Sequence, residues 1–321
     1  MKGSPLAAVT GGTGFLGRHV LAALAREGWR LRVLVRRDAQ RPDGIAAPDI
    51  VRGDLTDADA LHRLVQGAQA VVHLAGLTKA RRRSEFLAVN RDGSARLAAA
   101  VVAAAPGARC ILVSSLAARE PRLSAYAESK QAGEAAAIAA LEDRVPWVVL
   151  RPSVIYGPGD REGIALCRLA TARIVPVPRP PEPRITFVHA ADVAAAIATL
   201  CHSGPAGARF EVTDGQHAGY EWQEVLRLIG EYLQHQPRFL PVPDIALLAA
   251  GAVADAWAVL SGNASLFGRG KAREVLHRDW SSAAQRQLPS LVWTPRVTLR
   301  SGLRETVAWW ATLGLPEGAH A

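Results

Sequence analysis

The chain has 321 residues, of which 49% are hydrophobic and 21% charged, so it is long and apolar enough for a globular protein with a substantial core. Its 38 Lys and Arg residues exceed its 29 Asp and Glu residues, which gives a net charge of +9. No nucleic-acid-binding motif accompanies this charge, so we expect no nucleic-acid partner. The three cysteines lie far apart without metal-ligand spacing, so we expect reduced thiols, no metal site and a cytoplasmic location.

Short β-branched runs alternate with alanine-rich helical patterns in the first half of the chain. This alternation predicts an α/β fold in which a Rossmann-type, doubly wound parallel sheet is covered by helices on both faces. The predicted strands are Leu6–Thr10, Leu31–Val35, Ile50–Arg52, Ala70–Leu74, Cys110–Ser114 and Trp147–Leu150. The predicted helices are Gly17–Glu27, Ala58–Gln66, Gly93–Ala104 and Ala125–Leu141.

After residue 151 the pattern changes, and a proline-rich loop, Pro176–Arg184, leaves the main sheet. Two further strands, Ile185–Val188 and Arg209–Val212, flank a predicted helix at Ala191–Leu200. The remainder, beginning with an amphipathic helix at Glu221–Leu233, is expected to be mostly helical. We therefore expect a cofactor domain of residues 1–160 and about 185–215, and a smaller C-terminal substrate region of about 161–184 and 216–321.

Residues 245–260 form a strongly apolar segment that Asp255 interrupts. The segment is shorter than the ~20 residues that a membrane span requires. We expect a buried helix over the substrate. Contact with a membrane surface or with a lipidic substrate is the alternative.

Three glycines, Gly11, Gly14 and Gly17, follow the first predicted strand and precede a predicted helix. Glycine at these positions allows a tight turn, a close approach of the backbone to a pyrophosphate, and close packing of helix on strand. The helix N-terminus then offers free N–H groups to the phosphates. We therefore predict a dinucleotide site here, which also includes Thr13, Phe15 and Leu16.

The second strand is followed by Arg36 and Arg37, where an acidic residue would indicate NAD. Arginine can pair with a 2′-phosphate, so we expect NADP(H) rather than NAD(H). Asp54, next to Leu55, is expected to reach the adenine or else to cap the following helix. The remaining predicted cofactor contacts are Leu74, Ala75 and Gly76 after the fourth strand, Pro152 and Val154 after the sixth, and Tyr126 and Lys130.

Tyr126 and Lys130 are four residues apart on a predicted helix and therefore share one face. A ketone that accepts a hydride also needs a proton, and a neighbouring ammonium is expected to lower the pKa of the Tyr126 phenol. Ser115, at the end of the fifth strand, is the predicted group that polarises the substrate carbonyl. Asn90 is expected either to support Lys130 or to serve as an ordinary helix cap. His73 and His189 are expected to be core histidines.

As a set, these motifs resemble the extended short-chain dehydrogenase/reductases, also called the NAD-dependent epimerase/dehydratase family. The motifs that carry the resemblance are Thr10–Gly17, Gly53–Leu55, His73–Gly76, Val89–Asn90, Val113–Ser115, Tyr126–Lys130 with Gly133–Glu134, Leu150–Pro152 with Tyr156–Pro158, Phe187–His189 with Asp192–Val193, and Trp293–Pro295. The resemblance implies that Ser115, Tyr126 and Lys130 form the catalytic triad, with Asn90 as a fourth member. It also allows a homodimer through residues 93–104 and 125–141.

The resemblance leaves the substrate open. An aromatic–asparagine step that is common in nucleotide-sugar epimerases is replaced here by Arg151–Val154, which favours a reductase of a hydrophobic small molecule. The expected function is NAD(P)-dependent hydride transfer between a nicotinamide and a carbonyl or secondary alcohol. The alternatives are a nucleotide-sugar epimerase or dehydratase that retains NAD, and a non-catalytic cofactor-bound sensor or accessory subunit.

Overall fold

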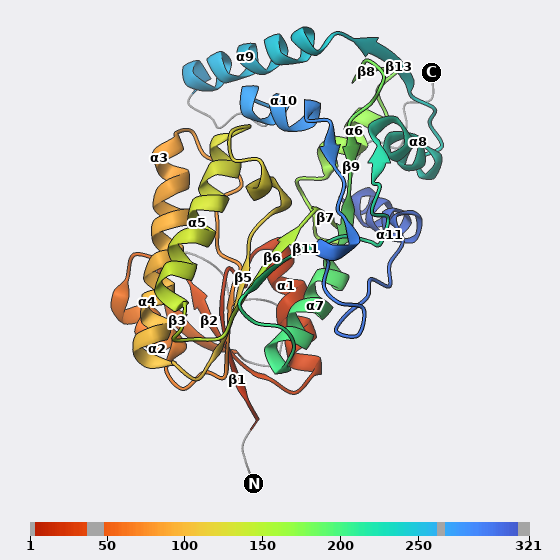
Figure 1. Ribbon diagram of the computed structural model, residues 1–321. Helices are drawn as coiled ribbons and strands as arrows, with labels where there is room; N and C mark the ends of the chain where they lie inside the picture. The colour runs from red at the N-terminus through yellow and green to blue at the C-terminus, as the bar shows by residue number, and fades with distance from the viewer. Residues whose placement is uncertain (1–3, 37–47, 262–266, 314–321) are drawn as a thin grey trace.

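Seven parallel strands form the central sheet of the computed structural model, which describes residues 4–36, 48–261 and 267–313 (Figure 1). In the sheet the strands follow the order β11-β6-β5-β4-β1-β2-β3. Their bounds are β1 (Leu6–Thr10), β2 (Arg30–Val35), β3 (Asp49–Arg52), β4 (Ala70–His73), β5 (Arg109–Val113), β6 (Trp147–Pro152) and β11 (Ala208–Val212). The direction of winding reverses between β1 and β4, and ligands of such sheets bind outside the carboxyl ends of the strands at this point.

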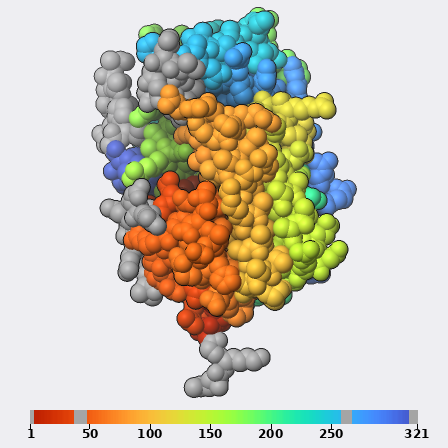
Figure 2. Space-filling model, turned by 90° about the vertical axis from the view of Figure 1, so that its left-hand side faces the viewer, coloured from red at the N-terminus to blue at the C-terminus, as the bar shows by residue number. Residues whose placement is uncertain are grey.

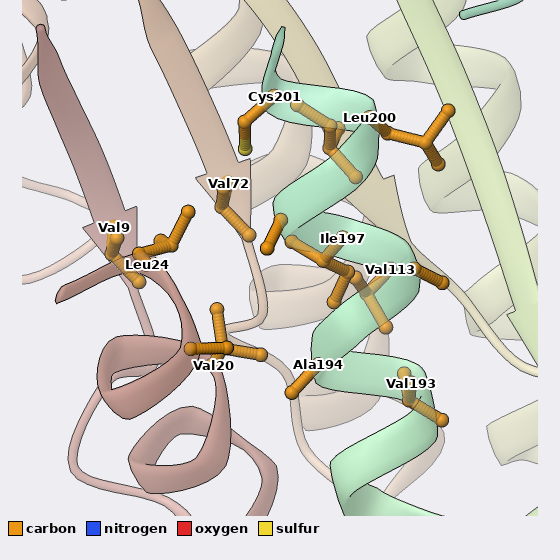
Figure 3. Close-up of a cluster of buried hydrophobic side chains, with 14 of the residues drawn as sticks. Val9, Val20, Leu24, Val72, Val113, Val193, Ala194, Ile197, Leu200 and Cys201 are labelled. Atoms are coloured by element: carbon orange, nitrogen blue, oxygen red, sulfur yellow. The ribbon is translucent and has the colours of Figure 1, made fainter. Parts of the chain in front are cut away.

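Helices cover both faces of the sheet, as the alternating pattern predicts (Figure 1). One face is covered by α1 (Phe15–Arg26) and α7 (Ala190–His202), and the other by α2 (Ala58–Val65), α4 (Gly93–Ala104) and α5 (Ala125–Leu141). Successive residues of β1 therefore pack into opposite cores, because side chains alternate along a strand. Figure 3 shows the first of these cores, where Val9 and Val72 meet Leu24 of α1 and Ile197 of α7.

The C-terminal part adds helices and three small sheets at the carboxyl end of the main sheet (Figures 1 and 2). Its elements are β7 (Val154–Tyr156), α6 (Ile164–Ala170), β8 (Ile174–Pro178), β9 (Arg184–Ile185), β10 (Phe187–His189), β12 (Tyr220–Glu221), α8 (Trp222–Tyr232), β13 (Arg238–Val242), α9 (Asp244–Ser261), α10 (Arg269–Leu276), β14 (Asp279–Trp280) and α11 (Leu299–Ala311). We call α6, α8, α9, α10 and the sheets β8–β13 and β12–β9–β14 the cap. Apart from β9, which overlaps the strand expected at Ile185–Val188, the short strands of the cap were not expected from the sequence.

The strand expected at Ile185–Val188 is broken into two. β9 pairs with β12 and β14, whereas β10 pairs with β7. The break falls at Thr186, whose buried hydroxyl donates to the Trp280 carbonyl (2.9 Å). One stretch of chain thus belongs to two sheets, which its β-branched composition does not reveal.

The apolar segment after residue 244 forms helix α9 as expected, but the helix is not buried. Ile245, Val253 and Trp257 are 74%, 71% and 70% exposed. The expectation of a buried helix was therefore wrong, because apolar residues on every side of a helix do not show which sides find a packing partner. In the described ranges, no helix has the length and apolar character needed to cross a bilayer.

Candidate active site at the carboxyl edge of the sheet

The glycine-rich turn between β1 and α1 is closely packed against the end of β4. Gly11 has φ +72°, and a Cβ there would lie 2.6 Å from the Ala75 nitrogen. A Cβ on Gly17 would lie 2.2 Å from the Gly11 carbonyl oxygen. Gly14 precedes α1 with an extended backbone, and no side chain caps the helix there. The exposed start of α1 can therefore offer its free N–H groups to an anion, as the sequence motif predicts.

The other predicted cofactor contacts lie along the same edge of the sheet, at different depths. Arg36 is exposed directly after β2, the strand beside β1, whereas Arg37 lies outside the described residues. Asp54 is exposed, and its carboxylate accepts hydrogen bonds from the Thr56 amide (2.7 Å) and hydroxyl. The helix cap is instead Asp57, which accepts from the Ala60 amide (2.9 Å). The capping alternative for Asp54 is therefore wrong.

Leu55 and Pro152, two of the predicted cofactor contacts, are buried. The Leu55 side chain packs against α4, where a Cβ on Gly93 would lie 2.7 Å from it. Pro152 is buried at the end of β6, and Val154 is half-buried at the start of β7.

The segment after β4 joins the glycine turn to the predicted catalytic residues. The Leu74 amide donates to the Thr10 carbonyl (3.2 Å) and the Ala75 amide to the Thr10 hydroxyl (3.3 Å). A Cβ on Gly76 would lie 3.1 Å from Oδ1 of Asn90 and 3.7 Å from Nζ of Lys130. The glycine turn and the polar side chains of α5 therefore meet at the switch point of the sheet.

Ser115, Tyr126, Lys130 and Asn90 are brought together here from three elements. Ser115 follows β5 and shares a hydrogen bond with the Tyr126 hydroxyl near the start of α5. One turn further along α5, Lys130 donates from Nζ to the Val113 carbonyl (3.0 Å). Asn90 lies in a short π-helix, Leu87–Asp92, and its Oδ1 accepts from the Leu77 amide (2.7 Å). Asn90 is thus buried and holds the loop after β4, which is more than an ordinary cap does.

Burial controls the pKa values of the two titratable groups. It raises the pKa of Tyr126 to about 12, while the hydrogen bond from Ser115 opposes that rise. Burial also lowers the pKa of Lys130 to about 8, although the carboxylate of Glu134 opposes the change. The expectation of an unusually acidic phenol is corrected: its pKa moves upward, because desolvation of the phenolate outweighs the Ser115 hydrogen bond and the ammonium is directed at the Val113 carbonyl.

Three further polar residues surround this group, and the sequence motifs that contain them gave them no role in the site. Ser129 is fully buried, accepts from Nδ2 of Asn90 (2.8 Å) and donates to the Tyr126 carbonyl (2.7 Å). Glu134 binds Arg151 through two hydrogen bonds (2.6 and 2.9 Å) beneath Lys130. The Ser114 hydroxyl is buried and has no hydrogen-bond partner in the described part of the chain. Ser129 could have been found, since it lies inside the Tyr126–Lys130 motif.

A small cavity of about 20 Å³ adjoins this polar group. Asn90, Ser114 and Lys130 are among the residues that line it. The space is sufficient for one water molecule, which would satisfy the Ser114 hydroxyl.

The two buried histidines have structural positions. His73 bonds to the hydroxyls of Thr10 (2.7 Å) and Ser94 (2.9 Å), and burial lowers its pKa to about 3, so it is neutral. Nδ1 of His189 accepts from the Ala191 amide (3.4 Å) at the start of α7. Both agree with the expectation of core histidines.

Comparison with known proteins connects this geometry to a family. A sequence model of the NAD dependent epimerase/dehydratase family matches residues 7–213. A ceramide reductase of Caulobacter vibrioides is 44% identical over 319 residues, which cover 98% of this chain and 97% of that protein. A 4-hydroxy-2-methyl-3-oxo-4-farnesyl-3,4-dihydroquinoline-1-oxide ketoreductase of Stigmatella aurantiaca is 29% identical over 92% of this chain and 93% of its own.

A solved structure of UDP-glucose 4-epimerase from Thermotoga maritima shares the fold, with a TM-score of 0.73 over 97% of this chain and all of that one, at 19% identity. The family match covers all of the sheet except Leu6 and every residue of the polar group. The chain therefore belongs to the NAD dependent epimerase/dehydratase family and is an extended short-chain dehydrogenase/reductase enzyme that uses a nicotinamide cofactor.

Proposed function

We propose that the protein is an NADP(H)-dependent reductase that acts on the keto form of a ceramide-like lipid. The observation that carries this proposal is the convergence of Ser115, Tyr126, Lys130 and Asn90 beside the glycine turn. This convergence occurs in a chain that is 44% identical to a ceramide reductase over 98% of its length. A ceramide has a secondary alcohol, and hydride transfer interconverts such an alcohol with a ketone.

Each residue of the polar group has a separate role in the proposed reaction. The cofactor, when bound, supplies or accepts the hydride. Tyr126 is protonated at neutral pH, since its pKa is raised to about 12, and it gives this proton to the substrate oxygen. Ser115 orients the same oxygen through its hydroxyl. Lys130, fixed by the Val113 carbonyl, supplies a positive charge beside the reacting groups, and Asn90 holds the loop at Gly76.

The glycine turn is the proposed pyrophosphate site. Gly11, Gly14 and Gly17, with Thr13, Phe15 and Leu16, would hold it through backbone N–H groups at the start of α1. The other proposed contacts of the cofactor are Asp54, Leu55, Leu74, Ala75, Gly76, Tyr126, Lys130, Pro152 and Val154. Residues 161–184 and 216–321, which include the cap, would bind the substrate through the surface that faces α5 and not through the exposed residues of α9.

Preference for NADP(H) is proposed from Arg36 and Arg37. Arg36 is exposed directly after β2, and arginine binds phosphate through two parallel hydrogen bonds, which supports a contact with a 2′-phosphate. The Kd of NADPH should therefore be lower than that of NADH, and Arg36→Glu should reverse the order. Equal Kd values in the unmodified protein would refute the preference. The three buried free cysteines support a reducing compartment such as the cytoplasm.

The function itself is tested by following NADPH consumption with two substrates. A keto-ceramide with a short acyl chain, dispersed in detergent, should be reduced with one NADPH consumed for each alcohol formed. UDP-glucose should cause no turnover. Epimerisation of UDP-glucose without net NADPH consumption would instead support a nucleotide-sugar epimerase, and the proposal would fail.

A further inference from the structure

Helix α9 has its polar and apolar sides reversed relative to an ordinary surface helix. Between Asp244 and Trp257 every fully exposed residue is apolar, and the set includes Ile245, Ala249, Ala250, Val253, Ala256 and Trp257. These positions cover an arc of about 140° at 3.6 residues per turn. Both carboxylates of this stretch, Asp244 and Asp255, lie on the opposite side of the helix. We call the exposed arc the apolar face of α9.

The opposite side of α9 is fixed to α10 along its length. A Cβ on Gly251 would lie 3.0 Å from the Arg269 nitrogen and 3.1 Å from Cβ of Ala272. Asp255 accepts a hydrogen bond from the Arg269 amide (3.0 Å). Helix α9 therefore lies beside α10 at the top of the molecule (Figure 1), and its apolar face is exposed on the side away from α10.

Helix α10, which packs against the opposite side of α9, is basic. Its exposed residues include Arg269, Lys271 and Arg273. Arg269 pairs with Asp255 (3.5 Å) and Lys271 with the buried Glu274 (3.2 Å), so among the described residues Arg273 is the cation of α10 that has no carboxylate partner. Arg278 is exposed just after α10 and lies 3.8 Å from Asp244. An exposed apolar helix face carried by a basic helix behind it suits an anionic lipid bilayer, where apolar side chains enter the acyl boundary and basic ones such as Arg273 meet the headgroups.

The same region is connected to the catalytic helix. Glu274 accepts a hydrogen bond from Ser124, the residue that caps the start of α5, and Tyr126 follows two residues later. Next to α9 in the chain, Leu240 of β13 is 52% exposed, and Ile174 of the paired strand β8 is 57% exposed. Helix α9 therefore lies at the same end of the molecule as the N-terminus of α5 (Figure 1).

We propose that the apolar face of α9 docks in the interface of an anionic phospholipid bilayer. The docking is argued from the exposed surface and its charges. The passage of a lipid from that bilayer to Tyr126 rests in addition on the proposed function.

Flotation with phospholipid vesicles tests the docking. The purified full chain should float with vesicles of phosphatidylcholine and phosphatidylglycerol, and more weakly with phosphatidylcholine alone. Val253→Glu combined with Trp257→Glu should weaken binding by about tenfold or more, because two charges replace apolar groups at the interface. Leu291→Glu is the matched control, since Leu291 is fully exposed and lies outside α9. This variant should bind the vesicles as the unmodified protein does. Arg273→Gln should weaken binding to the anionic vesicles only.

Three outcomes would overturn the docking. The first is failure of the unmodified protein to bind the anionic vesicles. The second is equal binding by the double variant in α9 and the unmodified protein. The third is a combination of two results: the unmodified protein does not bind vesicles, and sedimentation analysis shows a dimer that the double variant dissociates. The apolar face would then be covered by a second copy of the chain.

The two proposals can fail separately. Reduction of dispersed keto-ceramide without vesicle binding would refute the docking and support the proposed function. Vesicle binding without reduction of any keto lipid would do the reverse. If both hold, the double variant in α9 should reduce the dispersed substrate at the normal rate and the vesicle-embedded substrate at least about tenfold more slowly.

Discussion

The carboxyl edge of the sheet and the apolar face of α9 follow opposite rules. At the edge, polar side chains are buried and nearly all have hydrogen-bond partners, as Asn90 and Ser129 do. On α9, large apolar side chains such as Val253 and Trp257 face outward without packing. Buried polar groups are costly unless they are bonded, and exposed apolar groups forgo the stabilisation that burial gives. The buried polar group supports the proposed active site, and the exposed apolar face supports the proposed docking surface.

The sharpest test of the proposed active site at the carboxyl edge is removal of the Tyr126 hydroxyl. Tyr126→Phe should lower kcat for ketone reduction by about 10²–10⁴-fold, since a positioned general acid contributes that much. The Kd of NADPH, measured by fluorescence titration, should change little. Tyr232→Phe is the control, because the Tyr232 hydroxyl at the end of α8 bonds the Arg300 carbonyl of α11 (2.9 Å), away from the edge. Retained turnover in Tyr126→Phe would remove the phenol from the mechanism.

Close packing at the edge is tested by adding a single methyl group. Gly17→Ala should lower the free energy of unfolding by about 1–3 kcal/mol, because its Cβ would meet the Gly11 carbonyl oxygen and overpack the turn. Loss of NADPH binding should accompany this change. Gly107→Ala, where a Cβ meets nothing within 4 Å, should stay within about 0.5 kcal/mol of the parent. Urea unfolding measures both, and equal stabilities would contradict the packing.

The pH dependence tests the charge at the edge. Burial lowers the pKa of Lys130 to about 8, so its ammonium is present below that pH and is lost as the pH rises through it. The value of kcat/KM for ketone reduction should therefore fall about tenfold between pH 7 and pH 9. Lys130→Arg keeps a positive charge throughout and should flatten the profile. A falling limb at the same pH in this variant would assign it to another group.

The smallest effect is expected on the outer face of α9. Ile245→Ala should change the free energy of unfolding by no more than about 0.5 kcal/mol, because the side chain is exposed. Leu64→Ala, at a fully buried position, should cost about 2–5 kcal/mol. Thermal and urea unfolding compare the two variants. A large loss in Ile245→Ala would show that the face is covered in solution.

Local patterns predicted the main sheet and the elements that hold the active site. Strand Leu6–Thr10 and helices Gly93–Ala104 and Ala125–Leu141 have the predicted bounds, and the other elements of the sheet layer differ by one or two residues at an end. These segments are set by periodicity and by glycine or capping residues. The meeting of residues from β5, α5 and the π-helix was predictable because parallel strands end at one edge.

The remaining features depend on partners that a local pattern does not reveal. The upward shift in the pKa of Tyr126 depends on how deeply neighbouring elements bury the ring. The break at Thr186 depends on the Trp280 carbonyl, which is 94 residues away. The exposure of α9 depends on α10 covering only one of its sides. In each case tertiary contacts decided between local alternatives.

The division of Arg184–His189 between two sheets has a consequence for unfolding. The backbone of β9 belongs to the cap, and that of β10, one residue later, is paired with β7. On helix α7, Asp192 accepts hydrogen bonds from the amides of Arg296 and Val297, which ties a distant part of the chain to the same place (3.1 and 2.9 Å). We therefore expect unfolding of the β9 sheet in the cap to disrupt the pairing of β10 with β7 as well. Calorimetry should then record one cooperative unfolding transition for the whole molecule.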